Sequence, residues 1–147
     1  MAALTTKPAR PIVVETRGLK KTYFGKVATP VLHGIDIAIR EGEFVAIIGQ
    51  SGSGKSTLLN ILGALDVPTE GHVLIDDVDI ATLSEDQLAA LRNRVVGFVF
   101  QFHYLLDELT CLENVLTPVT ISKGEANAEE MARALALLKS GVGRSDP

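Results

Sequence analysis

Hydrophobic residues occur in several short runs that have the character of β-strands. Residues 31–40 place isoleucine at every second position from 35 to 39, which predicts a strand with one face exposed to water. Residues 12–15 and 73–75 are shorter β-prone runs. Residues 44–48 (FVAII) and 95–100 (VVGFVF) are apolar almost throughout, as expected of parallel strands covered on both faces.

Helical spacing of leucine and alanine, together with helix-start signals, predicts four helices between or after these strands. Their starts lie at residues 55, 84, 110 and 127. The second and third starts carry capping boxes, SEDQ and TCLE, in which the first and fourth side chains bond the opposite backbone amides. Pro118 is expected to end the third helix. Strands and helices in this mixture predict an α/β fold.

Length and composition limit the class of protein. A chain of 147 residues has room for one domain, and 46% hydrophobic with 22% charged residues is typical of a globular protein. No apolar run approaches 18 residues, and residues 1–10 lack the apolar core of a signal peptide. The single cysteine, Cys111, cannot build a disulfide framework and favours a cytosolic compartment.

Charge is distributed unevenly along the chain. The net charge is −4, with seven Lys/Arg and two acids in residues 1–40 and seven Lys/Arg and sixteen acids in residues 41–147. The overall balance argues against a general nucleic-acid-binding protein. The basic start favours an anionic ligand, or it is simply a solvated tail and first strand.

The strongest chemical signal is the segment GQSGSGKST at residues 49–57, which fits G-x-x-x-x-G-K-[ST] at every specified position. Glycines let backbone N–H groups close around phosphate oxygens, and the following helix presents its positive N-terminus to them. Lys55 can neutralise β/γ-phosphate charge, Ser56 can bind Mg²⁺, and Thr57 can bond the α-phosphate. The strand before it and the helix after it distinguish this loop from an incidental Gly/Ser-rich turn. The predicted nucleotide contacts are Gly49, Ser51, Gly52, Ser53, Gly54, Lys55, Ser56 and Thr57.

Further segments narrow the family. Residues 49–60 resemble ABC-transporter ATPases, as do VLHGI at 31–35 before EGEFVAII at 41–48, PTEGHV at 68–73 and GFVFQ at 97–101. The resemblance covers about residues 12–139. Two runs look most like the lipoprotein-releasing and macrolide-export group of this family, namely FQFHYLL at 100–106 and LTCLENV at 109–115.

The resemblance implies a P-loop NTPase (ABC ATPase) core with an N-terminal antiparallel β-subdomain and the start of a helical subdomain, with the C-terminal half absent. Residues 1–11 are then a flexible lead-in and residues 12–147 a partial nucleotide-binding domain. Within it, residues 12–101 hold the β-subdomain and phosphate loop, and residues 101–147 hold the Q-loop and the helical start. Because strands from the absent half would separate residues 44–48 from residues 95–100, both predicted strands should lack neighbours.

By resemblance, Tyr23 aligns with the aromatic residue that stacks on adenine, and Phe24 is the alternative stacking residue. The competing interpretation is that Tyr23 is an ordinary aromatic residue of an edge strand, with no role in binding. Gln101 aligns with the Q-loop glutamine, which positions Mg²⁺ and water in this family. The competing interpretation is that Gln101 is a loop amide without a role in the site. Lys55 and Gln101 are therefore the candidate catalytic residues, and Ser56 and Gln101 the candidate Mg²⁺ ligands.

Other potential sites have a simpler interpretation. Asp76, Asp77 and Asp79 could suggest a Mg²⁺ site, but a solvated turn is favoured. The histidines, at positions 33, 72 and 103, lack the spacing of metal ligands. Cys111 at a helix start is better explained as a small packing residue than as a reactive thiol.

The function implied by the resemblance is that of an ATP-binding subunit. It would couple Mg·ATP binding and hydrolysis to export of a lipoprotein or hydrophobic compound. Its partners would be a transmembrane permease and a second ATPase subunit in a homodimer, on the cytoplasmic face of the inner membrane. The 147 residues contain no LSGGQ signature, Walker B motif or switch histidine, so we expect this chain alone to be inactive or nearly so. The alternatives are a non-hydrolysing nucleotide-binding or interaction module and, less favoured, a phosphate-loop kinase or GTPase.

Overall fold

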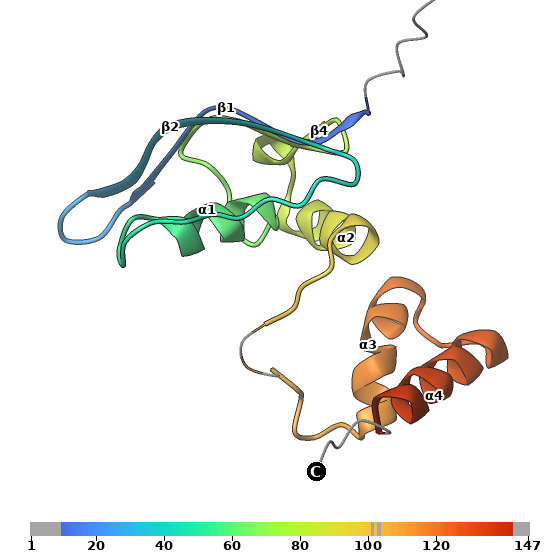
Figure 1. The fold of residues 1–147 in the computed structure, drawn as a ribbon. Helices are drawn as coiled ribbons and strands as arrows, with labels where there is room; N and C mark the ends of the chain where they lie inside the picture. The colour runs from blue at the N-terminus through green and yellow to red at the C-terminus, as the bar shows by residue number, and fades with distance from the viewer. Residues whose placement is uncertain (1–9, 101, 103, 143–147) are drawn as a thin grey trace, which may run out of the picture. The chain divides into compact units, whose positions relative to one another are not determined.

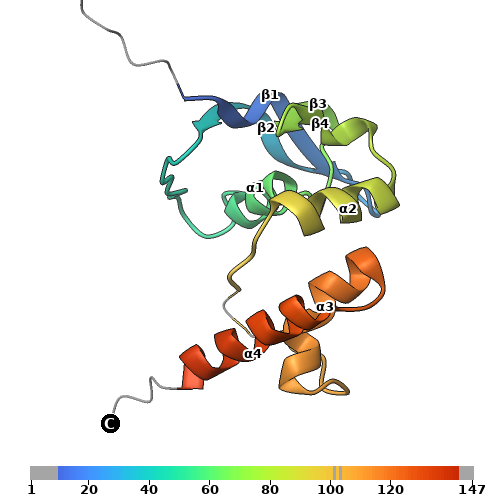
Figure 2. The same cartoon turned by 90° about the vertical axis from the view of Figure 1, so that its right-hand side faces the viewer.

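The computed structural model describes residues 10–100, 102 and 104–142. Along the chain these residues divide into two units, with the boundary between Val96 and Gly97. The first unit contains a β-sheet with two helices, and the second contains two helices (Figures 1 and 2). Each unit is described by itself.

A four-stranded antiparallel sheet in the order β2-β1-β3-β4 forms one layer of the first unit. Its strands are β1 (Ile12–Tyr23), β2 (Thr29–Arg40), β3 (Glu70–Ile75) and β4 (Val78–Asp79). All three predicted strands of this sheet are confirmed. β1 is longer than the run at 12–15 indicated, because it continues through a register shift that lies between Thr16 and Leu19 in its pairing with β2 and between Arg17 and Lys20 in its pairing with β3.

The buried Thr16 hydroxyl bonds the backbone at this irregular point. Thr16 Oγ1 donates to the carbonyl oxygen of Ile35 at 2.7 Å and accepts from the amide of Ile37 at 3.0 Å. A buried hydroxyl is tolerated because both its donor and its acceptor are used.

Two helices cover one face of this sheet, α1 (Lys55–Leu62) and α2 (Glu85–Val95), with a short 3₁₀ turn η1 (Ile80–Thr82) between β4 and α2 (Figure 2). The core forms where they meet. Its fully buried members are Leu19 and Val73 from the sheet, Ile61 from α1, Ala64 just after α1, and Ile80 from η1. The capping box predicted at the start of α2 is present, with Ser84 and Gln87 each bonding the other's backbone amide.

The prediction of strands at residues 44–48 and 95–100 was wrong. Neither segment is a strand, and Val95 instead closes α2. Phe44 is 97% exposed, Ile48 is 91% exposed and Val99 is fully exposed. Apolar sequence favours a buried strand, but a strand also needs neighbours for its backbone N–H and C=O groups. In the part of the chain that the structure describes, no strand pairs with either segment.

The second unit consists of α3 (Cys111–Lys123) and α4 (Ala128–Val142), which pack against each other. The capping box between Thr110 and Glu113 is confirmed. The prediction that Pro118 ends α3 was wrong, because Pro118 lies inside this helix. A proline removes one helical hydrogen bond without forbidding the helix, and α3 continues to Lys123. Gly124 follows it and donates its amide to the carbonyl of Thr120. Among the described residues, no helix is long and apolar enough to cross a membrane.

Candidate functional site

The predicted phosphate loop runs into the first turn of α1, as the sequence required. Gly54 occupies the position before the helix with φ of +88°, and Gly52 has φ of +78°. These are left-handed conformations that favour glycine. Gly54 is also pressed against β2. A Cβ atom there would lie 2.8 Å from Leu32 Cδ2 and 3.3 Å from the carbonyl oxygen of Val31. The glycine therefore permits both the turn and the close approach.

A cavity of about 260 Å³ opens at this turn. It is lined by Val31 of β2 and by Ser51, Gly52, Gly54, Lys55, Ser56 and Thr57. Six of the eight predicted nucleotide contacts therefore line one cavity. The other two, Gly49 and Ser53, belong to the same loop but do not line it.

The electrostatics of the cavity favour an anion. It lies at the N-terminal end of α1, where no side chain caps the helix and no acidic residue occupies the first turn. The amide of Leu58 donates to Gly54, so the amides of residues 55–57 precede the first intrahelical bond. Lys55 Nζ donates to the carbonyl oxygens of Gly49 at 2.9 Å and Gln50 at 2.6 Å. A cation, free amides and hydroxyl groups thus share one hollow that carries no carboxylate.

Tyr23 belongs to the same sheet as the cavity-lining Val31. It is the last residue of β1 and pairs with Thr29 of β2, two residues before the cavity-lining Val31. Tyr23 is 43% exposed, and its hydroxyl donates to Asp66 Oδ2 at 3.1 Å. Phe24, the alternative stacking residue, is 77% exposed. Tyr23 therefore combines an accessible ring with a fixed hydroxyl end.

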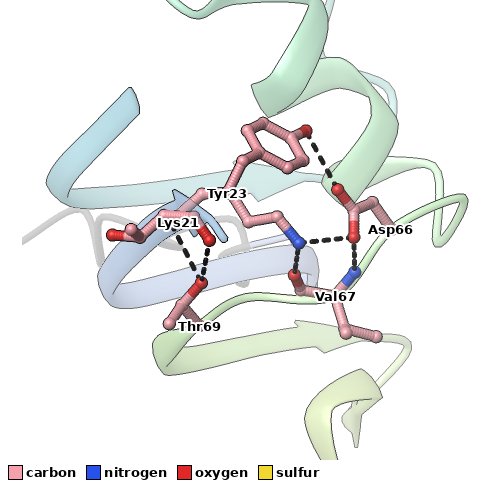
Figure 3. A network of polar contacts seen from close by, with 6 residues as sticks. Lys21, Tyr23, Asp66, Val67 and Thr69 are labelled. Carbon is pink, nitrogen blue, oxygen red and sulfur yellow. Dashed lines mark hydrogen bonds and ion pairs between the residues drawn. The ribbon is translucent and has the colours of Figure 1, made fainter. Parts of the chain in front are cut away.

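Lys21 and Asp66 surround Tyr23 and form a polar network with it (Figure 3). Lys21 Nζ donates to Asp66 Oδ1 at 2.6 Å and to the Val67 carbonyl at 2.8 Å, and it lies 5.0 Å from the centre of the Tyr23 ring. Partial burial acts to raise the pKa of Asp66, but hydrogen bonds from Lys21, the Val67 amide and Tyr23, with the Lys21 charge, lower it overall.

Sequence reasoning missed Lys21 and Asp66 as parts of this site. They are 45 residues apart, so no local spacing connects them. One signal was available. Lys21 and Tyr23 are separated by two positions in a strand and therefore project from the same face.

The remaining candidates are placed as follows. Gln101 lies outside the described residues. Asp76 and Asp77 form the two-residue turn between β3 and β4, with φ of +50° and +61°, so the turn interpretation is confirmed. Asp79 accepts from the amide of Ala81 and contacts His72 Nδ1 at 2.7 Å. Within the described ranges, no group of three or more His, Cys, Asp or Glu could hold a metal ion. Cys111 is exposed at the first position of α3, so the interpretation as a packing residue was wrong.

Comparison with known proteins identifies the family. The ABC transporter family matches residues 32–145. The lipoprotein-releasing system ATP-binding protein LolD of Anaeromyxobacter dehalogenans is 50% identical over 86% of the chain. The macrolide export ATP-binding/permease protein MacB of Syntrophobacter fumaroxidans is 47% identical over 89% of the chain. The chain spans 53% of that LolD and 19% of that MacB.

A solved structure is similar as well. It is the ATP-binding cassette MJ0796 in a dimeric post-hydrolysis state bound to ADP and Pi, with a TM-score of 0.76 and 45% identity, and the match covers 86% of this chain and 56% of that one. The sequence match extends over most of the chain. The structural match confirms that the fold is the N-terminal part of a P-loop ABC ATPase core. The chain therefore belongs to the ABC transporter family.

Proposed function

We propose that the chain binds Mg·ATP and is the N-terminal part of an ATP-binding subunit of an ABC transporter of the lipoprotein-releasing or macrolide-export type. The observation that carries this proposal is the cavity at the start of α1, in which Lys55, Ser56 and Thr57 meet a glycine turn with exposed helix-terminal amides. The relatives named above give the transporter type.

The cavity suggests a division of roles. The amides of residues 55–57 bind phosphate oxygens at the positive end of α1. Lys55 exchanges the carbonyl oxygens of Gly49 and Gln50 for phosphate oxygens, replacing two dipole contacts with charged ones. The hydroxyl of Ser56 would hold Mg²⁺, which prefers oxygen ligands, and the bound ion would supply positive charge against the phosphates. Thr57 bonds the α-phosphate, and Tyr23 stacks on the base.

The partners and the location that we propose are also based on these relatives. We propose a second copy of the subunit, in line with the dimeric cassette MJ0796, and a transmembrane permease that holds the pair at the cytoplasmic face of the inner membrane. Gln101 positions Mg²⁺ and water in that assembly. Because the 147 residues contain no LSGGQ signature or Walker B motif, we propose that this chain alone turns over little or no ATP. The cargo is a lipoprotein or a hydrophobic compound.

Binding is tested by titrating the 147-residue chain with a fluorescent ATP analogue and Mg²⁺. Lys55→Ala should weaken binding by about 10- to 100-fold, because it removes a charged contact. Lys139→Ala is the matched control, since Lys139 is exposed in α4. Absence of saturable binding by the wild-type chain would refute nucleotide binding by this chain. A phosphate-release assay decides on hydrolysis, and turnover that Lys55→Ala abolishes would refute the proposed inactivity.

A further inference from the structure

We infer that Lys21 and Asp66 are positioning residues for base recognition. Asp66 holds the Tyr23 ring at one angle through its hydroxyl, and Lys21 occupies one face of the ring, so that a nucleotide base stacks on the other. The inference rests on the proposed function, because it concerns how the same site binds the base.

The lysine is placed by the strand that carries the tyrosine. Lys21 and Tyr23 project from the same face of β1, and Lys21 Nζ lies over the Tyr23 ring at 5.0 Å from its centre (Figure 3). An ammonium group at this distance is attracted to the electron-rich face of an aromatic ring. A base cannot stack where the ammonium sits. The geometry therefore leaves the opposite face of the ring, on a residue that is 43% exposed.

One carboxylate fixes both groups. Asp66 uses Oδ1 for Lys21 and the Val67 amide, and Oδ2 for the Tyr23 hydroxyl. The Lys21 ammonium and the Tyr23 hydroxyl are thus held by the same carboxylate. This holds the ring from two directions before any ligand arrives, and ordering a contact group in advance lowers the entropy cost of binding.

Two further contacts anchor the network to the rest of the first unit. Between the two side chains, the backbone of Thr22 donates to and accepts from Thr69 Oγ1 at 3.0 and 3.2 Å. Asp66 follows α1 by four residues, and the intervening Ala64 is fully buried, with its carbonyl bonded by Arg92 at 2.7 Å. Because α1 begins in the phosphate cavity, the element that presents the phosphate loop also leads into the segment that orients the tyrosine.

Burial separates this pair from an ordinary surface ion pair. The Lys21 side chain is 11% exposed, whereas the neighbouring Lys20 is 49% exposed and pairs with Glu70 at 2.7 Å. A shielded ammonium needs its partners, and an exposed pair contributes little. Lys20 therefore provides a matched control one residue away.

The experiment compares two ligands, Mg·ATP and Mg·tripolyphosphate, which carry the phosphates with and without the base. Binding of each is measured calorimetrically on the 147-residue chain. Lys21→Met keeps the apolar stem and removes the charge. We expect it to weaken Mg·ATP binding by about 3- to 10-fold and to leave Mg·tripolyphosphate binding unchanged, while Lys20→Met changes neither. Asp66→Asn should behave as Lys21→Met does.

Other outcomes overturn specific claims. If Lys21→Met weakens both ligands equally, the pair only supports the fold and the inference is wrong. If it weakens neither, while Lys55→Ala weakens both, the inference fails and the proposed function stands. If wild type binds neither ligand, both fail.

A second variant keeps the inference falsifiable if Lys21→Met does not fold. Tyr23→Phe retains the ring and the ion pair and removes only the hydroxyl bond to Asp66. It should weaken Mg·ATP binding by about 2- to 5-fold without affecting Mg·tripolyphosphate. Wild-type affinity of Tyr23→Phe for Mg·ATP would then refute the inference. Circular dichroism establishes whether each variant is folded.

Discussion

Replacing Gly54 by alanine tests whether the phosphate loop is held against the sheet as the structure indicates. Alanine at φ of +88° costs about 1–2 kcal/mol in backbone strain. The added methyl group would also lie 2.8 Å from Leu32 Cδ2 and 3.3 Å from the backbone oxygen of Val31. The leucine can rotate, but the backbone oxygen can move only with β2, and overpacking of this kind costs about 1–3 kcal/mol. We therefore expect Gly54→Ala to destabilise the first unit by about 2–5 kcal/mol.

Gly52→Ala separates the two contributions. Gly52 has a similar φ of +78°, yet a Cβ atom there would meet nothing within 4 Å. It should cost only the strain, about 1–2 kcal/mol. Urea unfolding gives both free energies. Tyrosine emission in a Tyr104→Phe background reports the first unit alone, because the chain has no tryptophan and two tyrosines, at positions 23 and 104. Equal destabilisation by the two alanines would show that the contact between Gly54 and β2 does not exist.

Three further predictions concern the first unit. Asp77→Gly should stabilise it by about 0.5–1 kcal/mol, since glycine adopts the φ of +61° in this turn without strain, and the thermal midpoint measures the gain. Ile61→Ala should cost about 2–5 kcal/mol in urea unfolding, whereas Leu59→Ala on the exposed face of α1 should cost much less. Folding lowers the pKa of Asp66, so its stabilisation is fully present above the unfolded-state pKa and is lost as pH falls through the folded one. The difference in unfolding free energy between wild type and Asp66→Asn should therefore hold from about pH 7 to 5 and shrink below the ordinary value of 3.8.

Features whose physical cause is local could be predicted from the sequence. The phosphate loop and both capping boxes depend on side chains and amides within a few residues, and all three are present. The turn at Asp76 and Asp77 is local in the same sense. Pro118 was misjudged because a local rule on breaking a helix was applied to a helix that tolerates one missing bond.

The network around Tyr23 could not be predicted because its contacts join distant parts of the chain. Sequence pattern placed Tyr23 at a strand, and family resemblance gave the ring a role. Neither indicated that a carboxylate 43 residues away would bond its hydroxyl, or that the same carboxylate would hold a lysine over its face. Only the pairing of β1 with β3 and the return of the chain after α1 bring these groups together.

The apolar runs at residues 44–48 and 95–100 show the difference between a preference for burial and the means to satisfy it. Their composition favours a strand covered on both faces, and this preference belongs to the residues themselves. Pairing belongs to the neighbours, and the family resemblance had implied that the neighbouring strands come from sequence beyond these 147 residues. In the structure, Phe44 and Ile48 lie almost fully exposed in an unpaired segment directly before the phosphate loop. That loop is nevertheless formed, held by Gly54 against β2 and by α1 in the core. The cavity at the start of α1 therefore depends on the antiparallel sheet and its helix, and the nucleotide binding that we propose does not require residues 44–48 to be paired.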